Sequence, residues 1–254
     1  MSDHAPETRS QSFGGRRVAF FGGSFDPPHL GHLAVARAAR AALGLDAVLF
    51  APVGAQPLKP AGTAAGFDER MAMTRLAIAS EPEFFLSLAD APRPSGAPNY
   101  TIETLLNLRA ELPPGSALFC LMGADSFSAL RLWHRAAEIP FAAPLIVASR
   151  PGWRLDDLPS ALPEGVTLES SPEPGRLGAG VKLRSWLLVN RTEERAPFYL
   201  LPGLHVDISA SEIRAQIRAE IGSQHRSFSG PPAAGDALLP AAVLDYILSR
   251  KLYR

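Results

Sequence analysis

Short apolar runs alternate with longer amphipathic stretches through the first 150 residues of the chain. The apolar runs are typical of buried strands, which we predict at 18–21, 47–52, 84–88, 117–122 and 144–149. Between them, good helix formers that end near Gly or Pro predict helices at 30–43, 67–80, 102–112 and 126–139. Strands that alternate with helices of about ten to fifteen residues indicate βαβ units and a parallel sheet.

The pattern is looser after residue 150. Strands are predicted at 182–190 and 198–201, a loop at 169–180, and a polar stretch without regular structure at 222–236. The clearest late helices are predicted at 209–221 and 240–252, and the second carries an apolar stripe of Val243, Leu244, Ile247 and Leu248.

Together these elements predict an α/β fold, a Rossmann-like doubly wound parallel sheet with C-terminal helices. We expect one domain over 16–254, with a core of 16–150 and a C-terminal part of 151–254, behind a disordered polar tail of residues 1–15. Open α/β sheets bind ligands at the carboxyl ends of their strands, near a topological switch point, so the site is expected there.

Composition limits the partners of the chain. Lys and Arg together number 25, as do Asp and Glu, so nothing global draws the chain to nucleic acid or to an anionic membrane. The polar start lacks a signal-peptide core, and no stretch approaches the roughly 20 apolar residues that span a bilayer. The single cysteine, Cys120, is expected to be an inert core residue in a reducing, cytoplasmic setting.

The segment 22–32, Gly-Gly-Ser-Phe-Asp-Pro-Pro-His-Leu-Gly-His, lies between the first predicted strand and the first predicted helix. Gly22 and Gly23 can adopt positive φ and can let a ligand approach the backbone closely. His29 and His32 are three residues apart at the helix start, so both rings can lie on one face beside the positive end of the helix dipole. This arrangement suits phosphate oxygens that gain charge in a transition state, and Gly31 leaves room for a nucleotide.

Other interpretations of this pair stay open. A His-x-x-His pair is also half of a zinc site, although no nearby carboxylate or cysteine completes a ligand set, and two surface histidines can occur by chance. The segment is neither a Gly-x-Gly-x-x-Gly dinucleotide loop nor a Walker loop, because the glycine spacing and the Lys-Ser/Thr pair are absent.

A second candidate site opens the helix predicted at 209–221. Ser209 and Glu212 have the spacing of a capping box, and Arg214 follows one turn into the helix. From there its guanidinium can turn toward an anion held by the free N–H groups of the helix start. An ordinary capped helix with a surface arginine would have the same pattern.

The two segments together resemble the nucleotidyltransferase superfamily, which pairs an HxGH motif with a late Ile-Ser-x-(Ser/Thr)-x-x-Arg motif. The resemblance implies a Rossmann-like fold and contact between His29, His32 and the ATP phosphates. It also implies that Ser209, Ser211 and Arg214 bind phosphate. The rest of the implied ATP site comprises Gly22, Gly23, Ser24, Phe25, Gly31 and Ile208.

From about residue 18 to the C-terminus the chain is similar to the nicotinate-nucleotide adenylyltransferases. The similarity implies that Lys59, in Pro57-Leu58-Lys59-Pro60, offers charge to phosphates, and that Gly123 and Asp125 lie beside the nucleotide. It further implies a nicotinate-nucleotide site formed by Tyr100, Thr101, Trp133 and Arg150. Simpler roles remain for several of these residues: Trp133 in the core, Asp125 as a helix cap, Lys59 as a solvated lysine, and Tyr100 with Thr101 as a helix start.

The activity that the resemblance implies is transfer of the adenylyl group of ATP to nicotinate mononucleotide, which gives deamido-NAD and pyrophosphate. The acceptor phosphate is largely ionised at neutral pH and needs no general base. Mg²⁺ is expected to bind through the ATP phosphates and not at a metal site of the protein. His29, His32, Lys59 and Arg214 are the expected catalytic residues.

Two alternatives are kept. A phosphopantetheine adenylyltransferase would have similar phosphate motifs, although a tryptophan after Gly-Ala-Asp favours a flat aromatic acceptor. A non-catalytic nucleotide-binding module belongs to another class of function, and the retention of both histidines and Arg214 argues against it. The choice between nicotinate and nicotinamide mononucleotide, and whether the chain forms a homo-oligomer, are left open.

Overall fold

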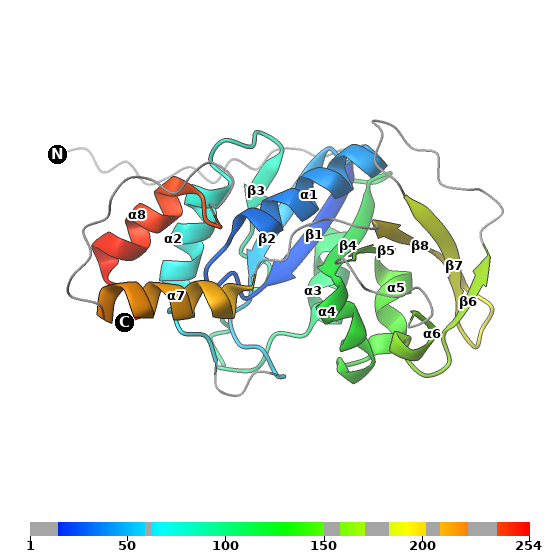
Figure 1. Cartoon of the computed structure of the whole chain (residues 1–254). Coiled ribbons are helices and arrows are strands. Elements are labelled where there is room, and N and C mark those ends of the chain that lie inside the picture. The colour runs from blue at the N-terminus through cyan, green and yellow to red at the C-terminus, as the bar shows by residue number, and fades with distance from the viewer. Residues whose placement is uncertain (1–14, 59–61, 150–157, 171–182, 202–208, 223–237) are drawn as a thin grey trace.

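The computed structural model describes residues 15–58, 62–149, 158–170, 183–201, 209–222 and 238–254. One eight-stranded sheet runs through the molecule in the order β3-β2-β1-β4-β5-β8-β7-β6 (Figure 1). The strands are β1 Arg17–Gly23, β2 Ala47–Pro52, β3 Phe84–Leu86, β4 Ala117–Gly123, β5 Leu145–Ala148, β6 Thr167–Ser170, β7 Arg184–Val189 and β8 Arg195–Leu201. The α/β class and Rossmann-like fold predicted from the sequence are confirmed.

The sheet is parallel from β3 to β8 and antiparallel beyond it. β7 pairs antiparallel with β8, and β6 antiparallel with β7, so the predicted parallel sheet carries an antiparallel edge that the sequence did not indicate. The short connection of residues 190–194 between β7 and β8 explains the change, because a parallel pair needs a crossover of a dozen or more residues.

Successive residues of the central strands point to opposite faces of the sheet and so build two cores. On one face, Phe119 and Leu121 of β4 pack in a cluster with residues of α1 (Leu30–Leu43). On the other face, Cys120 and Met122 of the same strand pack with residues of α3 (Thr101–Glu111) and α5 (Ile139–Ala142). Helices therefore cover both faces, as a doubly wound sheet requires.

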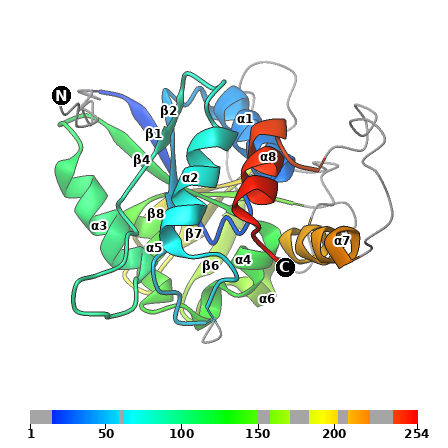
Figure 2. The same cartoon turned by 90° about the vertical axis from the view of Figure 1, so that its left-hand side faces the viewer.

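A third apolar cluster joins the C-terminal helices to α2 (Phe67–Ala77). It contains Met73 of α2, Ile213 and Ile217 of α7 (Ala210–Gly222), and Val243 and Ile247 of α8 (Ala241–Arg250). Figure 2 shows these three helices close together, and Figure 1 shows them on the side of the molecule where β3 ends the sheet. Two residues of the predicted stripe, Val243 and Ile247, are fully buried, so the stripe does face a core.

The helix predicted at 126–139 is wrong as a continuous element. The chain forms α4 (Ala124–Ser128), two 3₁₀ turns (Leu130–Leu132 and Ala136–Glu138) and then α5. Trp133 has extended backbone angles, φ −79° and ψ 153°, and Arg135 is left-handed at φ 51°, so neither can continue a helix.

Two other elements differ from the expectation. The first two residues of the loop predicted at 169–180 belong to β6. The other residues of that loop, 171–180, lie outside the described residues. A short helix, α6 (Leu158–Ala161), was not predicted. Within the described part of the chain, no helix has the length and apolar character needed to cross a membrane.

Candidate active site

A cavity of about 750 Å³ opens at the carboxyl ends of β1 and β4. The chain leaves β1 toward β2 on one side and returns to β4 on the other, so this is the topological switch point of the sheet. Fifteen residues proposed from the sequence line the cavity: Gly22, Gly23, Ser24, Phe25, His29, Gly31, His32, Tyr100, Thr101, Gly123, Asp125, Trp133, Ser209, Ser211 and Arg214. Lys59, Arg150 and Ile208 lie outside the described residues.

His29 and His32 open α1 as a stacked pair. Their ring centroids are 3.7 Å apart with an angle of 32° between the planes. His29 is the N-cap residue, and its backbone N–H donates to Nδ1 of His32 at 3.2 Å. His32 thus reaches back to the cap as a glutamate does in a capping box. Since Nδ1 accepts this bond, a neutral His32 carries its proton on Nε2.

Gly22 and Gly23, which precede this pair of histidines, have the backbone conformation of a strand. Both belong to β1 and neither has positive φ, so the left-handed conformation that glycine allows is not used here. Gly22 is required for space, since a Cβ there would lie 2.7 Å from the ring of Phe20. The left-handed residue is Phe25 at φ 46°, a conformation that is rare for a bulky side chain.

The strained Phe25 is held by burial. Its ring is 1% exposed and packs edge-on against Phe21 at 5.5 Å and His32 at 4.9 Å between centroids. Strain of this kind costs about 1–3 kcal/mol and persists only where the surroundings fix it. The same contact orients the His32 ring at the cavity wall.

The second motif lies against the first. Arg214 of α7 donates through Nη1 to the backbone oxygen of Asp26 at 2.6 Å, and through Nη2 to Oγ of Ser211 at 3.3 Å. Helix α7 begins directly after Ser209, the residue predicted as its N-cap. The capping box of Ser209 with Glu212 stays a prediction. Two segments 188 residues apart therefore share one wall of the cavity.

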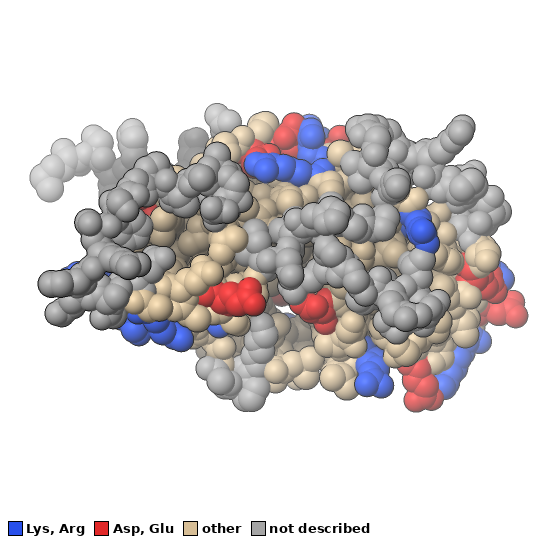
Figure 3. All heavy atoms as spheres, viewed as in Figure 1, with Lys and Arg blue, Asp and Glu red and all other residues tan. Residues whose placement is uncertain are grey.

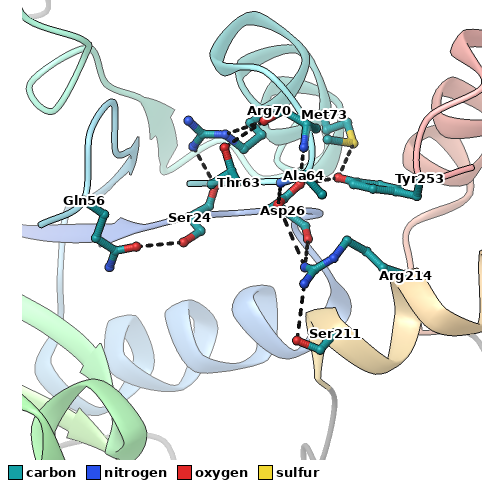
Figure 4. A network of polar contacts seen from close by, with 11 residues as sticks. Ser24, Asp26, Gln56, Thr63, Ala64, Arg70, Met73, Ser211, Arg214 and Tyr253 are labelled. Atoms are coloured by element: carbon teal, nitrogen blue, oxygen red, sulfur yellow. Dashed lines mark hydrogen bonds and ion pairs between the residues drawn. The ribbon is translucent and has the colours of Figure 1, made fainter. Parts of the chain in front are cut away.

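Arg70 of α2 supports this wall from behind (Figure 4). Its side chain is 1% exposed, and its guanidinium donates to the carbonyl oxygens of Ser24 and Val53 at 2.8 Å each and of Ala65 at 3.3 Å. Burial lowers the pKa of Arg70, although an arginine retains its charge. This buried arginine was not predicted as a site residue, because nothing in its local sequence marks a helix arginine as buried.

An aromatic wall closes the opposite side. Tyr100 is the N-cap residue of α3, and Thr101 is the first residue of that helix. The Tyr100 ring stacks on His134 with centroids 4.3 Å apart. Trp133 is partly buried against the core and also lines the cavity, so it packs as a core residue, and its contact with the nicotinate ring stays a prediction. His134 was not predicted, although it adjoins Trp133 in the chain.

Polar groups at the end of β4 complete the rim. Gly123 is the N-cap residue of α4, and Asp125 lies in the first turn of that helix, so the alternative role of Asp125 as a cap is wrong. Its side chain is exposed and lines the cavity. Across the cavity, the hydroxyl of Ser24 donates to Oε1 of Gln56 at 3.1 Å.

Two buried titratable groups face the cavity floor. The Asp90 carboxyl is 4% exposed, and burial raises its pKa, while the Thr104 hydroxyl donates to its Oδ1. Burial raises the pKa of the Cys120 thiol to about 12. Cys120 therefore stays protonated at neutral pH and is a poor nucleophile, as its sequence context predicts.

Charged side chains, acidic and basic, are spread over the face of the molecule drawn in Figure 3 and do not form one basic patch. Among the residues that the structure describes, no group of three His, Cys, Asp or Glu side chains is placed to hold a metal ion.

Comparison with known proteins identifies the family. A family model described as Cytidylyltransferase-like matches residues 20–216, which include both the β1–α1 turn and the start of α7. A relative in Stenotrophomonas maltophilia is 39% identical, and the alignment covers 92% of this chain and 96% of that protein. A relative in Gloeobacter violaceus is 36% identical over 94% and 97% of the two chains.

Both relatives carry the name "Probable nicotinate-nucleotide adenylyltransferase". This chain belongs to the cytidylyltransferase-like family and, within it, to the family of the nicotinate-nucleotide adenylyltransferases. The fold agrees with a solved structure, the Plasmodium falciparum nicotinic acid mononucleotide adenylyltransferase complexed with NaAD. It has a TM-score of 0.61 at 16% identity, over 94% of this chain and 97% of that one.

Proposed function

We propose that this protein transfers the adenylyl group of ATP to nicotinate mononucleotide, which gives nicotinate adenine dinucleotide and pyrophosphate. One phosphate oxygen of the mononucleotide attacks the α-phosphorus of ATP in line with the departing group. The new P–O bond replaces the bond between the α-phosphorus and the β-phosphate oxygen, and pyrophosphate leaves. Because the attacking phosphate is already ionised at neutral pH, catalysis consists of positioning and charge stabilisation.

The triphosphate is assigned to the wall that the two motifs share. The N-terminus of the 14-residue helix α1 carries partial positive charge, and His29 and His32 stand on its first turn. Donation from Nε2 of His32 toward the phosphates suits the proton position that its Nδ1 contact imposes. Arg214, with Ser209 and Ser211, faces the same space from α7 and is assigned to the leaving pyrophosphate, together with Lys59.

Mg²⁺ enters this proposal as part of the MgATP substrate. The acidic groups that line the cavity, Asp26, Asp90 and Asp125, are not gathered into a ligand set. A cation held mainly by ATP phosphate oxygens needs few protein ligands. When bound, it would neutralise charge on the pyrophosphate as that group leaves.

The mononucleotide is assigned to the aromatic wall. A flat pyridine ring fits against the indole of Trp133, near the stacked pair of Tyr100 and His134. Helix α3 begins at Thr101, which lines the same cavity, and the unpaired N–H groups that a helix start carries suit the nicotinate carboxylate. Arg150 is retained as a candidate for the mononucleotide.

One observation carries the proposal, namely the hydrogen bond from Arg214 to the backbone of Asp26. It brings the two phosphate motifs to one surface, opposite an aromatic wall that fits the second substrate. We further propose that residues 16–254 act as one nucleotidyltransferase domain, with a core of 16–150 and a C-terminal part of 151–254. We place the protein in the cytoplasm and leave its assembly into a homo-oligomer open.

The decisive experiment compares acceptors. Pyrophosphate release from MgATP is measured with nicotinate mononucleotide, nicotinamide mononucleotide or phosphopantetheine as the sole acceptor. Turnover that is strongest with the nicotinate substrate is expected. Turnover with phosphopantetheine alone would retain the phosphate site and overturn the acceptor. Absence of turnover with all three, in a protein that still binds MgATP, would favour a nucleotide-binding module.

A further inference from the structure

The carboxylate of Asp26 is held by hydrogen-bond donors from two separate segments of the chain (Figure 4). The Tyr253 hydroxyl donates to Oδ1 at 2.8 Å, and the backbone N–H groups of Ala65 and Ala64 donate to Oδ1 at 3.1 Å and Oδ2 at 2.6 Å. Asp26 is 4% exposed, so these donors replace the water that a carboxylate otherwise binds.

Arg214 meets the same aspartate in an unusual way. Its Nη1 bonds the backbone oxygen of Asp26, whereas the nearest carboxylate oxygen, Oδ2, is 3.9 Å away. An arginine beside a carboxylate commonly forms two short parallel hydrogen bonds, and such a pair would consume much of its charge and its donors. Here the carboxylate is turned toward Tyr253, Ala64 and Ala65, and Arg214 still lines the cavity.

We propose that Tyr253 is a positioning residue for ATP. Its hydroxyl keeps the Asp26 carboxylate from closing a short pair with Arg214, so that their contact stays a long ion pair of 3.9 Å and the guanidinium remains available to the triphosphate. This inference rests on the proposed function, because it assigns Arg214 to ATP. It adds a residue that does not line the cavity and acts only through Asp26.

The geometry around Tyr253 supports such a role. The chain turns back after α8 through left-handed backbone at Lys251 (φ 56°) and again at Tyr253 (φ 63°), and this turn carries the phenol into the protein. Such angles are uncommon for residues other than glycine, and Tyr253, unlike Lys251, is buried. Burial raises the pKa of Tyr253, so the hydroxyl stays protonated and can only donate to the carboxylate.

The chain offers a matched control in the same helix region. The Tyr246 hydroxyl donates to Oε2 of Glu69 at 2.5 Å and also joins α8 to α2. Neither Tyr246 nor Glu69 lines the cavity. Tyr246→Phe therefore removes a tyrosine–carboxylate hydrogen bond between these elements without touching Asp26.

The test compares Tyr253→Phe and Tyr246→Phe in the full chain. For each variant, KM for ATP is measured at saturating nicotinate mononucleotide, KM for the mononucleotide at saturating ATP, and Tm by calorimetry. We expect Tyr253→Phe to raise KM for ATP by about tenfold, as for loss of one hydrogen bond to a charged group, with KM for the mononucleotide unchanged. Tyr246→Phe should lower Tm and leave both KM values at the wild-type level.

A second comparison tests the route through Arg214. In an Arg214→Ala background, Tyr253→Phe should have no further effect on KM for ATP, since the group through which it acts is gone. An effect that persists there, or an unchanged KM for ATP in Tyr253→Phe itself, would overturn the positioning role and leave Tyr253 as a packing residue.

Failure of the proposed function would be seen separately, as absence of turnover in the wild-type protein with every acceptor. Calorimetric titration with MgATP would then compare the same variants. Equal affinity of the wild type and Tyr253→Phe for MgATP would overturn the positioning role in that case too.

Discussion

Nδ1 of His32 accepts the backbone N–H of His29 at 3.2 Å, while the two imidazole rings stack with centroids 3.7 Å apart. His32 therefore does two things with its two nitrogens. Nδ1 satisfies a donor at the start of α1, and Nε2 is the nitrogen that we assign to the triphosphate. The two roles are separable by substitution.

His32→Asn retains an acceptor near the position of Nδ1 but has no counterpart of Nε2, whereas His32→Ala lacks both. We expect both variants to lose about 10²–10³ in kcat. Only His32→Ala should also lose about 1 kcal/mol of stability, as for a missing helix cap. Pyrophosphate release and urea unfolding measure the two effects. An Asn variant with wild-type kcat would mean that His32 serves only the helix.

Trp133→Ala should raise KM for nicotinate mononucleotide by about ten- to a hundredfold, because a stacking surface is worth about 1–3 kcal/mol per base-like ring. KM for ATP should stay within about twofold of wild type. The control is Trp186→Ala, which removes an indole that packs against Phe198 at 6.0 Å but does not line the cavity. Equal effects of both variants on KM would identify Trp133 as a core residue only.

Arg70→Met is expected to be the most destabilising of these changes. It leaves the carbonyl oxygens of Ser24, Val53 and Ala65 without their buried donor, at a cost of about 1–3 kcal/mol for each unsatisfied group. Activity should fall as well, because these carbonyls belong to the segments that shape the cavity. Arg75→Met, at an exposed position of the same helix, should change stability by less than about 0.5 kcal/mol. Chemical denaturation compares the two.

Asp90 should make the stability of the fold depend on pH. Its pKa is raised by burial, so the folded state binds this proton more tightly than the unfolded state does. The stability due to the proton is present below the unfolded pKa, about 3.9, and is lost as the pH rises through the folded value.

Asp90→Asn cannot ionise. Its stability relative to wild type should therefore be lowest near pH 3 and increase as the pH rises toward 7, as measured by urea unfolding at each pH. A difference that does not change with pH would contradict the assignment of the raised pKa to Asp90.

The central elements could be predicted from the sequence because local signals decide them. Helix α1 has the predicted bounds of Leu30–Leu43, since good helix formers are followed by Gly44, which adopts φ 58° at the helix end. Strands β1, β2 and β4 are short apolar runs buried on both faces, as central parallel strands require. Motif spacing was likewise enough to place His29 and His32 together.

Backbone conformation was less predictable. The residues of 126–139 favour a helix by composition, but a left-handed Arg135 and an extended Trp133 break it, and this brings Trp133 to the cavity. Gly22 and Gly23, which can adopt positive φ, are strand residues, and the left-handed conformation occurs at Phe25. In both places tertiary packing overrides local preference.

Contacts between distant segments could not be predicted at all. Arg70 joins carbonyls of Ser24 and Val53, 46 and 17 residues away, and no spacing rule relates such positions. Asp26 lies inside the segment 22–32, which the sequence marked as a motif. Its hydrogen-bond partners could be identified only from the structure. The cavity wall to which we assign the triphosphate is therefore formed by motifs that the sequence predicts. The long-range contacts that hold these motifs in place could be identified only from the structure.

The long-range contacts of Asp26 also have a consequence for how the chain folds. Asp26 meets Arg214 and Tyr253 across 188 and 227 residues, so these contacts exist only when distant parts of the chain have come together. A partly folded chain with β1, β2 and β4 in register but without these contacts would still lack the cavity wall to which we assign the triphosphate. MgATP should then bind only to the completed fold and stabilise it by mass action, so that affinity for the nucleotide becomes a measure of folding quality.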